Sequence, residues 1–584
     1  MVYLPSIDNQ VAAENWGLPT LNAAFLAQPD VLLLGPDDYT TWPVQARQPM
    51  TYGIRYILLQ PGDYTGWDDV NYLDRYMPFE GGNSGAPVYV IGLRSTADQD
   101  LNTIGNPAGL TDSAVARLGT TYCVGSGAPY AVSHLYFFGV RFKGQIQISA
   151  NAQSIRLHRC EFDNVAAQPI RLRGTNAAVI SECYIHREPP YPTTADRIGV
   201  QLGDNVNDFA EIKYSTIIGY TDAIQTTNVT NNPTTPPGTS DTYGYAEGLR
   251  IHGCTLGFLP KHQSADGSEL LEGGENLLDC KTGGTAVNPI KVTGCILFGT
   301  RPNSRTPGYA LTVHIVADHI DISDCVFSDC ESVVFLNAQY VNNGGAGNGW
   351  HPLNLTIANN LISRCLSHGS AYYASQQGMV WSGSHTMVFI GNDIINVDQL
   401  CAQLPDAAAE AVQAMAISGN RWFGGTNYGA SYADEGAWLA DGNTVATAPT
   451  LMVRYGVPYT DETISIEIPE PTEWLKFASQ VAGETARDAI NTEIANVLTA
   501  EGYTLANGDA DVIAKKSGVD TAYTQAVPQA VLLQDSGTGF WVRNPQRAYA
   551  RHFFIRRSQW RQLLGGVTPV ATAQDAVPDQ QNPI

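Results

Sequence analysis

Several features that mark common protein classes are scarce or missing in this sequence. Charged residues make up only 15 % of its 584 residues, and lysine occurs 8 times against 25 arginines. The net charge is −23, whereas nucleic-acid binding needs a clustered basic face, so we expect no nucleic-acid partner. No apolar run reaches the roughly 18 residues that span a membrane, so we expect no membrane partner either.

The N-terminal residues also lack the features of a secretory signal. The segment MVYLPSIDNQVAAENWG has neither a basic n-region nor an apolar h-region. The strongly acidic composition suits a soluble surface. We expect a secreted or extracellular protein whose signal is absent from this sequence, and the alternative is a virion-associated protein.

Cysteine pairs of the CxxC type are absent, although the chain has ten cysteines. This absence argues against a zinc site. Glycine, in contrast, occurs 56 times, and together with frequent Asn, Thr and Val it favours a β-rich, turn-rich chain. At this length such a chain needs either several domains or an elongated repeat that adds core as it grows.

A degenerate repeat runs through the middle of the chain. Nine segments, among them SIRLHRCEF, LRIHGCTL and MVFIGNDI, broadly follow the pattern apolar-x-apolar-x-x-Cys/Asn-x-apolar. Their shared positions are Cys160, Cys183, Ser215, Cys254, Cys295, Cys325, Asn360, Asn392 and Asn420. A spacing of 23 to 41 residues with one such motif per period is typical of a solenoid. We therefore predict an all-β fold, a right-handed parallel β-helix, in which these side chains stack in one inward-facing column.

The same column accounts for most of the cysteines. An inward-facing thiol behaves as a small apolar filler, so we predict a ladder of reduced cysteines. Cys325 and Cys330 are the one pair for which another state stays open.

A second strand precedes each repeat segment, as in PIRLRG, GVQLGD and NLLDCK. The inward-facing positions of these strands are Ile170, Val200, Ile224, Leu278, Leu311 and Val334. Residues one and three positions later then point outward. The outward columns read Arg171, Gln201, Gln225, Asp279, Thr312, Phe335 and Arg173, Gly203, Thr227, Lys281, His314, Asn337. Neighbouring coils lie about 4.8 Å apart, so we expect Lys281 beside His314, and both Asp279 and Lys281 facing solvent.

The pattern divides the chain into four parts. Residues 1–125 are expected to form an irregular N-terminal cap with the first coils, including a helix at NAAFLAQ. Residues 126–452 form the predicted catalytic β-helix. Residues 453–566 begin with the helical periodicity of TEWLKFASQVAGETARDAIN and are expected to cover the other open end as a partly helical segment. Residues 567–584 have the composition of a disordered tail.

One strand carries a resemblance to a known family. The stretch GENLLDCKTGG, followed by IKVTGCIL, resembles the Glu-Asn-x-x-Asp-x-Lys pattern of pectate-lyase-like right-handed β-helix polysaccharide lyases. The coil pattern extends this resemblance over roughly residues 130–425. The resemblance implies β-elimination on an acidic polysaccharide in a groove along the helix, commonly with calcium and a lysine or arginine base.

The candidate catalytic residues follow from the requirements of that reaction. Removing the proton alpha to a uronate carboxylate requires a base, neutralisation of the carboxylate and departure of the glycosidic oxygen. We expect Lys281 as the base and His314 as the acid or a hydrogen-bond donor. Arg301 or Arg305 is expected to clamp the carboxylate, because a guanidinium matches it bidentately.

The other expected site residues bind metal or substrate. Asp222, Glu275 and Asp279 are the best oxygen ligands for a calcium ion. Gln201 and Gln225 stand in their column where the family pattern has aspartates, which is a departure at the expected calcium site. The candidate substrate-binding residues are Arg171, Arg173, Arg197, Tyr309 and Asn337.

Three alternatives stay open. Lys281 can pair with Asp279 or Glu275 on a solvated surface, where an ion pair contributes little. A hydrolase of the phage-tailspike type would use a carboxylate pair such as Asp204 and Asp208, or Glu275 and Asp279. A third alternative is a non-catalytic carbohydrate-binding β-helix. Pectate, alginate, a glycosaminoglycan and a bacterial exopolysaccharide all present a uronate, so the sequence selects none of them, and it fits a monomer or a trimer equally.

Overall fold

The computed structural model describes most of the chain between residues 17 and 446 and shorter parts beyond it. The described residues are 17–39, 42–67, 77–78, 81–108, 110–123, 132–148, 152–165, 168–187, 197–203, 209–226, 246–257, 276–298, 300, 309–314, 317–328, 330, 332–337, 354–363, 380–381, 387–395, 402–403, 415–423, 439–446, 473–477, 479–482, 484–485, 487–489, 491–492, 503–505, 513–516, 525–526, 531–534 and 540–544.

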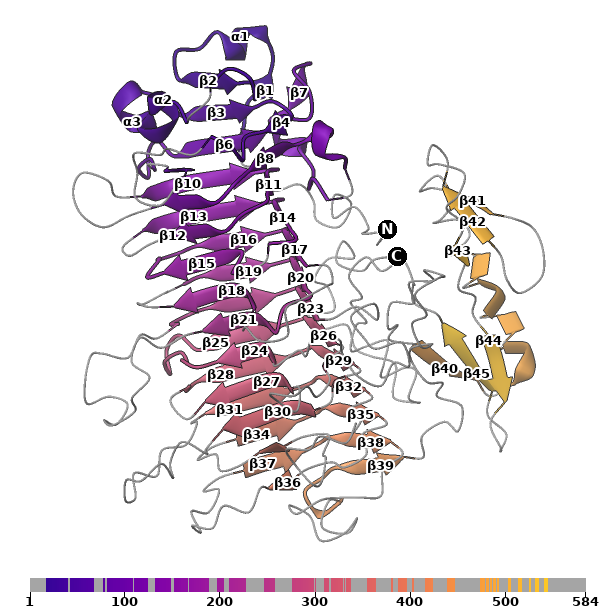
Figure 1. Ribbon diagram of the computed structural model, residues 1–584. Helices are drawn as coiled ribbons and strands as arrows, with labels where there is room; N and C mark the ends of the chain where they lie inside the picture. Colours follow the sequence, from indigo (N-terminus) through magenta and orange to yellow (C-terminus); the bar gives the residue numbers. More distant parts are fainter. Residues whose placement is uncertain are drawn as a thin grey trace, which may run out of the picture.

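Three long sheets run along the stack of coils in Figure 1. Sheet I consists of β2 (Val31–Leu34), β3 (Tyr56–Leu59), β6 (Val88–Gly92), β10 (Ser133–Phe138), β13 (Gln153–His158), β16 (Val179–Ser181), β19 (Glu211–Lys213), β22 (Arg250–His252), β25 (Ile290–Thr293), β28 (Ile320–Ser323), β31 (Leu355–Ala358), β34 (Met387–Ile390) and β37 (Met415–Ser418). Sheet II consists of β4 (Gly62–Asp63), β8 (Ala116–Leu118), β11 (Arg141–Phe142), β14 (Glu161–Asp163), β17 (Tyr184–His186), β20 (Thr216–Ile218), β23 (Thr255–Gly257), β26 (Ile296–Phe298), β29 (Val326–Ser328), β32 (Leu361–Ser363), β35 (Asp393–Ile395), β38 (Arg421–Phe423) and β39 (Thr444–Ala446). Sheet III consists of β5 (Met77–Pro78), β9 (Thr121–Cys123), β12 (Ile146–Ile148), β15 (Ile170–Arg173), β18 (Ile198–Gly203), β21 (Asp222–Thr226), β24 (Asn276–Cys280), β27 (Tyr309–His314), β30 (Ser332–Asn337), β33 (Val380–Trp381) and β36 (Ala402–Gln403).

Each coil from β3, β4 and β5 to β34, β35 and β36 contributes one strand to each sheet, and successive coils pair in parallel. β13, β14 and β15 form one coil, and they pair in parallel with β16, β17 and β18 of the following coil. The inward-facing side chains of all three sheets belong to one continuous buried cluster, which runs from Leu34 to Ile417. The chain is therefore an all-β parallel β-helix, and the predicted fold class is confirmed.

The repeat motif contains two strands, where the sequence indicated one strand entering a turn. The ladder residue sits at the corner between sheet I and sheet II, as Cys160 does between β13 and β14. The residue before each ladder position has a positive φ of 50° to 76°; these residues are Arg159, Glu182, Tyr214, Gly253, Gly294, Asp324, Asn359, Gly391, Gly419 and Gly442. This left-handed conformation, which glycine adopts most readily, makes the sharp corner.

The ladder side chains satisfy the buried backbone at these corners. The Nδ2 atom of Asn392 donates to Ile357 O at 3.0 Å and to Asn420 Oδ1 at 2.9 Å. Asn420 in turn donates to the Oδ1 atom of Asn443 at 2.9 Å, so the amide column continues one coil beyond the predicted repeat. In the preceding coils the Cys325 thiol donates to a backbone carbonyl at 3.3 Å.

The cysteine ladder consists of free, buried thiols. The eight cysteines of the described residues are all free and buried, including Cys325 and Cys330. Burial raises the pKa of the Cys123 and Cys280 thiols well above the usual value for cysteine. The prediction of a reduced ladder is confirmed for these residues, and the alternative for Cys325 and Cys330 is wrong because both are buried thiols with no disulfide between them.

Thiol titration tests this ladder directly. With an aromatic disulfide reagent, the native protein is expected to expose at most the two cysteines outside the described residues, because a buried neutral thiol is a poor nucleophile. All ten cysteines should react in denaturant under non-reducing conditions. Fewer reactive thiols in the denatured protein would indicate disulfides and contradict the ladder.

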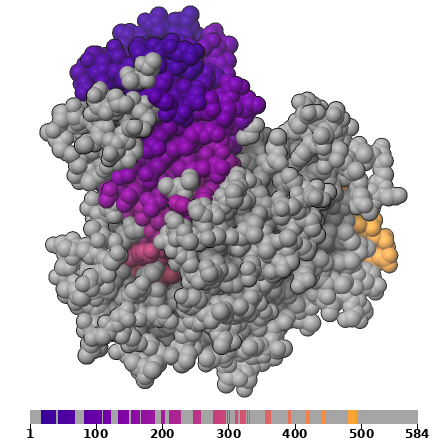
Figure 2. Space-filling view, viewed as in Figure 1, coloured from indigo at the N-terminus to yellow at the C-terminus, as the bar shows by residue number. Residues whose placement is uncertain are grey.

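The N-terminal coils carry a second apolar layer on the outer face of sheet I. Helix α1 (Ala23–Leu26), capped by the Asn22 side chain at 2.9 Å from Phe25 N, lies at the end of the stack beyond β2 in Figure 1. Phe25, Tyr89 and Tyr136 belong to a separate cluster of buried residues. In the space-filling view the described residues of these coils, indigo to purple, form a continuous surface (Figure 2). The expected N-terminal helix is confirmed.

The remaining elements are short. β1 (Thr20–Leu21) and β7 (Gln99–Asp100) form an antiparallel pair, helices α2 (Val44–Arg47) and α3 (Pro49–Tyr52) follow each other directly, and 3-10 turns cover Leu101–Thr103 and Asp112–Ala114. The C-terminal strands form two antiparallel sheets, one of β40 (Glu473–Phe477), β44 (Val531–Gln534) and β45 (Phe540–Asn544), the other of β41 (Tyr503–Leu505), β42 (Ile513–Lys516) and β43 (Gln525–Ala526).

The C-terminal segment is only partly as expected. The stretch EWLKF, which the helical pattern included, is strand β40, while the described residues of 480–492 are helical. Antiparallel pairing of this stretch with β45 outweighs the helical periodicity there. The tail 567–584 lies outside the described residues, and the domain boundaries stay predictions. No helix of the described residues is long and apolar enough to cross a membrane.

A buried histidine on sheet I makes stability depend on pH. His158 is 2 % exposed, and burial together with the Arg159 charge lowers its pKa to about 3. Glu182 Oε1 lies 4.0 Å from His158 Nε2 and would favour the charged ring, but Arg159 holds the other Glu182 oxygen at 2.7 Å. The cost of burying a charged ring therefore outweighs the attraction of Glu182, and His158 is neutral in the folded protein.

Acid is expected to destabilise the fold through His158. Unfolded histidine takes up its proton near pH 6.5 and folded His158 near pH 3, so between these values the unfolded state binds more protons and stability falls as the pH falls. At about pH 4.5 this linkage amounts to roughly 2–3 kcal/mol. His158→Gln should show a correspondingly smaller difference in urea-unfolding free energy between about pH 7 and 4.5. An unchanged difference would contradict a neutral His158.

Candidate functional site

The predicted outward column of sheet III exists in the structure. Strand pairing places Arg171 beside Gln201, Gln201 beside Gln225, and Gln225 beside Asp279. The next coils continue the column with Thr312 and Phe335. The two-residue period of a strand fixed these alignments once the inward-facing apolar residues had been identified.

The expected exposure of this column is wrong for its central residues. The side chain of Asp279 is 2 % exposed, and Gln225, Thr312 and Asp222 are also buried. Lys281, in the second outward column, keeps a side chain that is 38 % exposed. The two-residue alternation of a strand determines whether a side chain points into or out of the coil. Its burial depends in addition on which other segments cover the outer face, and the sequence pattern does not show these.

The buried polar side chains form one hydrogen-bonded network across four coils. Gln225 Nε2 donates to Asp222 Oδ2 at 2.8 Å and to Asp279 Oδ2 at 3.0 Å. Gln201 Nε2 donates to Gln225 Oε1 at 3.3 Å. Asn276 Nδ2 donates to Asp222 Oδ1 at 3.2 Å, and Thr312 Oγ1 donates to Asn276 Oδ1. Asp222 and Asp279 thus lie close together, since both accept from the same amide nitrogen.

Lys281 ends this network at the surface. Its backbone N–H continues the parallel ladder by donating to Thr226 O at 3.1 Å, just after β24 ends. Its Nζ atom lies 3.1 Å from Asp279 Oδ2. The ion pair between Lys281 and Asp279, which the sequence suggested as an alternative to a catalytic role, is therefore present. Its carboxylate is buried, however, and not on a solvated surface. Such a contact favours the charged ammonium.

The other expected catalytic residues are only partly described. Cys280 pairs with Val313, so the backbone of His314 follows in the same column as Lys281, and His314 pairs with Asn337. The side chains of His314 and Asn337 are outside the description. Arg301, Arg305 and Glu275 lie outside the described residues, as do Asp204 and Asp208.

The candidate substrate-binding residues occupy neighbouring coils of sheet III. Arg171 and Arg173 are partly buried on β15, and Arg197 stands directly before β18, where its backbone N–H donates to Thr221 Oγ1 at 2.7 Å. Tyr309 begins β27 and is 4 % exposed. Because Tyr309 is buried, its ring does not offer an open stacking surface.

Sequence reasoning missed the amides of the network. Gln225 bridges the two carboxylates and Asn276 donates to Asp222, yet the sequence marked the glutamines only as a departure from the family pattern. The available signal was position: Gln201, Gln225 and Asp279 fall in one column, and adjacent coils of a parallel sheet bring identical positions into contact. Polar residues repeated at one outward position therefore predict a network.

Comparisons with known proteins concern the fold. No protein-family model matches the chain, and no curated protein is similar to it in sequence. Among solved structures, pectate lyase Pel9A is 12 % identical and matches 59 % of this chain and 82 % of its own with a TM-score of 0.33. An alginate lyase from Paenibacillus sp. str. FPU-7 is 13 % identical over 67 % and 98 %, with a TM-score of 0.34. The tailspike protein of E. coli bacteriophage HK620 is 11 % identical over 88 % and 83 %, with a TM-score of 0.32.

Proposed function

We propose that this chain is a secreted, carbohydrate-active β-helix enzyme, a lyase that cleaves a uronate-containing polysaccharide by β-elimination on sheet III. The observation that carries the proposal is the partly exposed Lys281 ammonium 3.1 Å from Asp279, at the end of a buried row of carboxylates and amides. Burying two carboxylates costs free energy that simple packing would avoid. Such arrangements concentrate at functional sites.

Each proposed role follows from the chemistry of elimination. Lys281 takes the proton alpha to the uronate carboxylate, and His314, next in its column, serves the leaving oxygen. Arg301 or Arg305 holds the carboxylate. Asp279 favours the charged lysine, so the base is active on the alkaline side, where the ammonium loses its proton. The proposed substrate contacts are those of Arg171, Arg173, Arg197, Tyr309 and Asn337.

A calcium ion fits the donors at the centre of the network. Carboxylate and amide oxygens are the ligands that calcium prefers, and Asp222 and Asp279 present them together with Glu275 as the proposed third ligand. The Oε1 atom of Gln201 is buried without a hydrogen-bond partner, so an amide oxygen is also available there. When bound, the ion would supply positive charge beside the uronate carboxylate.

A screen of uronate polymers tests the reaction class. Elimination leaves an unsaturated sugar that absorbs in the ultraviolet, whereas hydrolysis produces reducing ends without that absorbance. We expect both signals to rise together on at least one polymer. New reducing ends without ultraviolet absorbance would contradict a lyase and indicate a hydrolase. Binding without cleavage of any polymer in the panel would indicate a carbohydrate-binding protein.

The pH dependence of cleavage tests the pairing of Lys281 with Asp279. Asp279→Asn removes the negative charge that favours the ammonium, so the alkaline rise in kcat should move to lower pH. Asp321→Asn on sheet I, which pairs with Lys291 in the neighbouring strand, is the matched control and should leave the profile unchanged. If the pH profile of kcat is the same in Asp279→Asn as in the parent, Lys281 is not the base.

The second candidate function is a hydrolase that uses Asp222 and Asp279. Both carboxylates accept from Gln225 Nε2, at 2.8 Å and 3.0 Å, so their oxygens are as close as those of a retaining glycosidase pair. This pair differs from those that the sequence suggested. Asp222→Asn would abolish hydrolysis if this candidate is right, with reducing ends as the readout.

A further inference from the structure

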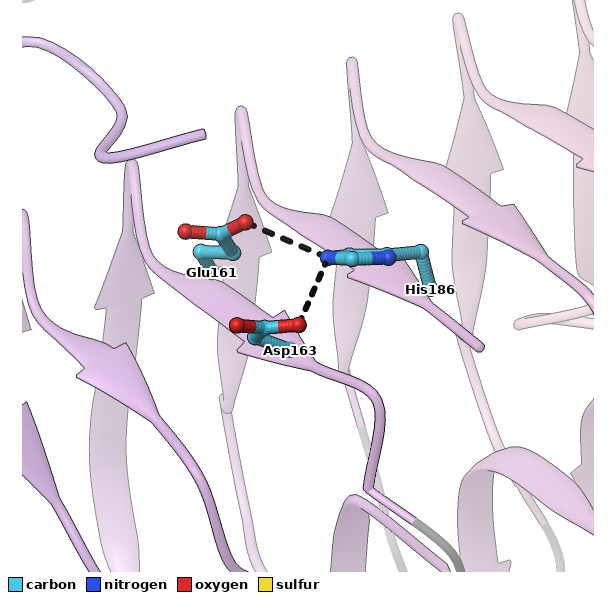
Figure 3. Close-up of side chains that lie close together, drawn as sticks. All are labelled: Glu161, Asp163 and His186. Atoms are coloured by element: carbon cyan, nitrogen blue, oxygen red, sulfur yellow. Dashed lines mark hydrogen bonds and ion pairs between the residues drawn. The ribbon is translucent and has the colours of Figure 1, made fainter. Parts of the chain in front are cut away.

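A second cluster of ionisable side chains lies on the outer face of sheet II, away from the sheet III network. Glu161 and Asp163 are two residues apart on β14 and therefore share one face of the strand. In the next coil, Asp163 pairs with His186 at the end of β17. Figure 3 shows the imidazole pointing between the two carboxylates.

Three ligand-type atoms converge in this cluster. His186 Nε2 lies 3.1 Å from Glu161 Oε1 and 3.6 Å from Asp163 Oδ1, and all three atoms lie within 4.8 Å of one another. A tetrahedral cation with bonds of about 2.0–2.1 Å holds its ligand atoms about 3.3 Å apart. The strand register thus sets separations that a metal ion could occupy with small side-chain adjustments.

The remaining carboxylate oxygens are held by cations on the preceding coil. Arg141 Nε lies 2.5 Å from Glu161 Oε2, and Lys143 Nζ contacts Asp163 Oδ2. Each carboxylate therefore directs one oxygen toward His186, as ligating carboxylates do when outer hydrogen bonds orient them. The ring of Tyr184 stacks on His186 at 4.2 Å with an angle of 14° and fixes the imidazole plane.

Hydrogen bonding and charge leave room for a cation. His186 Nε2 lies at hydrogen-bond distance from Glu161 Oε1, 3.1 Å, but its 3.6 Å separation from Asp163 Oδ1 is too long for a hydrogen bond. Asp112 contacts Arg141, Lys143 and also Arg117, which in turn pairs with Asp63. Four carboxylates of this surface therefore face three fixed cations, which leaves one negative charge in excess. Glu161 and His186 are 3 % and 8 % exposed, while the Asp163 side chain is 22 % exposed and gives access to solvent.

We propose that Glu161, Asp163 and His186 bind a divalent transition-metal ion such as Zn²⁺, with water completing the coordination. An imidazole with two carboxylates suits such ions, whereas calcium and magnesium prefer oxygen ligands alone. The ion links two successive coils of sheet II. The argument against zinc from the missing CxxC pattern concerned thiolate ligands only and does not apply to this set.

The affinity is expected to be moderate. A ligating histidine usually donates its other ring N–H to an acceptor, and His186 Nδ1 is buried without a hydrogen-bond partner. Binding by Nε2 leaves that proton unsatisfied. We therefore expect a dissociation constant in the micromolar range, with a rise in the apparent unfolding temperature when Zn²⁺ is in excess.

Metal titration of the full chain tests the site. After removal of metal with a chelator, calorimetric titration with Zn²⁺ should show one micromolar site that Ca²⁺ does not fill. Co²⁺ in its place should give the visible bands of tetrahedral coordination. His186→Ala should weaken Zn²⁺ binding at least about 100-fold, and Asp163→Asn at least about 10-fold.

A matched histidine provides the control. His252 Nε2 lies 3.0 Å from Glu211 Oε1 on sheet I, and no second carboxylate of the described residues forms an ion pair with it. His252→Ala should leave Zn²⁺ affinity unchanged. If His186→Ala fails to fold, Asp163→Asn becomes the test of the site. This variant is expected to fold, because the Asp163 side chain is partly exposed and asparagine is nearly the same size as aspartate. Parent-like Zn²⁺ affinity in Asp163→Asn, or no Zn²⁺ binding at millimolar concentration, would overturn the proposal.

Discussion

Lys281→Arg is expected to abolish polysaccharide cleavage while the protein stays folded. Arginine keeps the positive charge that pairs with the buried Asp279, but its guanidinium holds its proton more tightly than the lysine ammonium and is positioned differently, so it cannot replace Lys281 as an effective base near neutral pH. Loss of a general base reduces kcat by roughly 10²- to 10⁴-fold. The measurement is the rate of ultraviolet absorbance increase on the polymer that the parent cleaves, together with the circular dichroism spectrum.

Two further variants separate catalysis from stability. Lys281→Ala leaves the Asp279 carboxylate buried without its ammonium partner, which destabilises the protein in its own right, so it should be combined with Asp279→Asn. Lys291→Arg, at an exposed position of β25, is the matched control and should keep parent activity. Cleavage by Lys281→Arg within a few-fold of the parent would remove Lys281 from the base role.

Asn392→Ala is expected to cause a large loss of stability, comparable with that of Asn420→Ala, whose side chain also makes four hydrogen bonds. The side chain of Asn392 makes four hydrogen bonds. It accepts two from Asn360 and donates one each to Ile357 O and Asn420 Oδ1. Each contributes about 1 kcal/mol net, and unpaired buried partners cost more, so we expect a loss of roughly 3–5 kcal/mol. Urea unfolding and amide hydrogen exchange of β34 and β35 measure the effect.

The same substitution at an exposed asparagine provides the comparison. Asn176 is exposed, so Asn176→Ala should change stability by less than about 0.5 kcal/mol. Asn392→Ser should cost less than Asn392→Ala, because Ser215 occupies the same ladder position and accepts from Cys183 N at 3.1 Å. Equal stability of Asn392→Ala and the parent would mean that the amide column does not hold these coils together.

The coil architecture could be predicted because it depends on local rules. The two-residue alternation of strands and the repeated corner residue identify the inward column, and parallel stacking then aligns each position with its counterpart in the next coil. For this reason the predicted alignment of Gln225 with Asp279 is confirmed. The third strand of each coil was missed because it is only two or three residues long in most coils, as Glu161–Asp163 is.

The candidate site could be predicted only in part. The sequence marked Lys281, Asp279 and Asp222 through their residue types and column positions, and the structure brings them into one network. The bridging role of Gln225 depends on side-chain geometry across three coils, and the sequence pattern does not give this geometry. The same applies to His186, whose partners come from the neighbouring coil of a sheet that the sequence did not separate from sheet I.

The sequence by itself determined the β-helix, its column register and the stacked cysteines and asparagines, because periodicity and side-chain size act locally and repeat in every coil. Only the tertiary structure decided that Asp279 is buried while Lys281 stays partly exposed, and that Glu161, Asp163 and His186 converge. The physical reason is that burial and electrostatic pairing depend on all the segments around a side chain, including those far away in the chain.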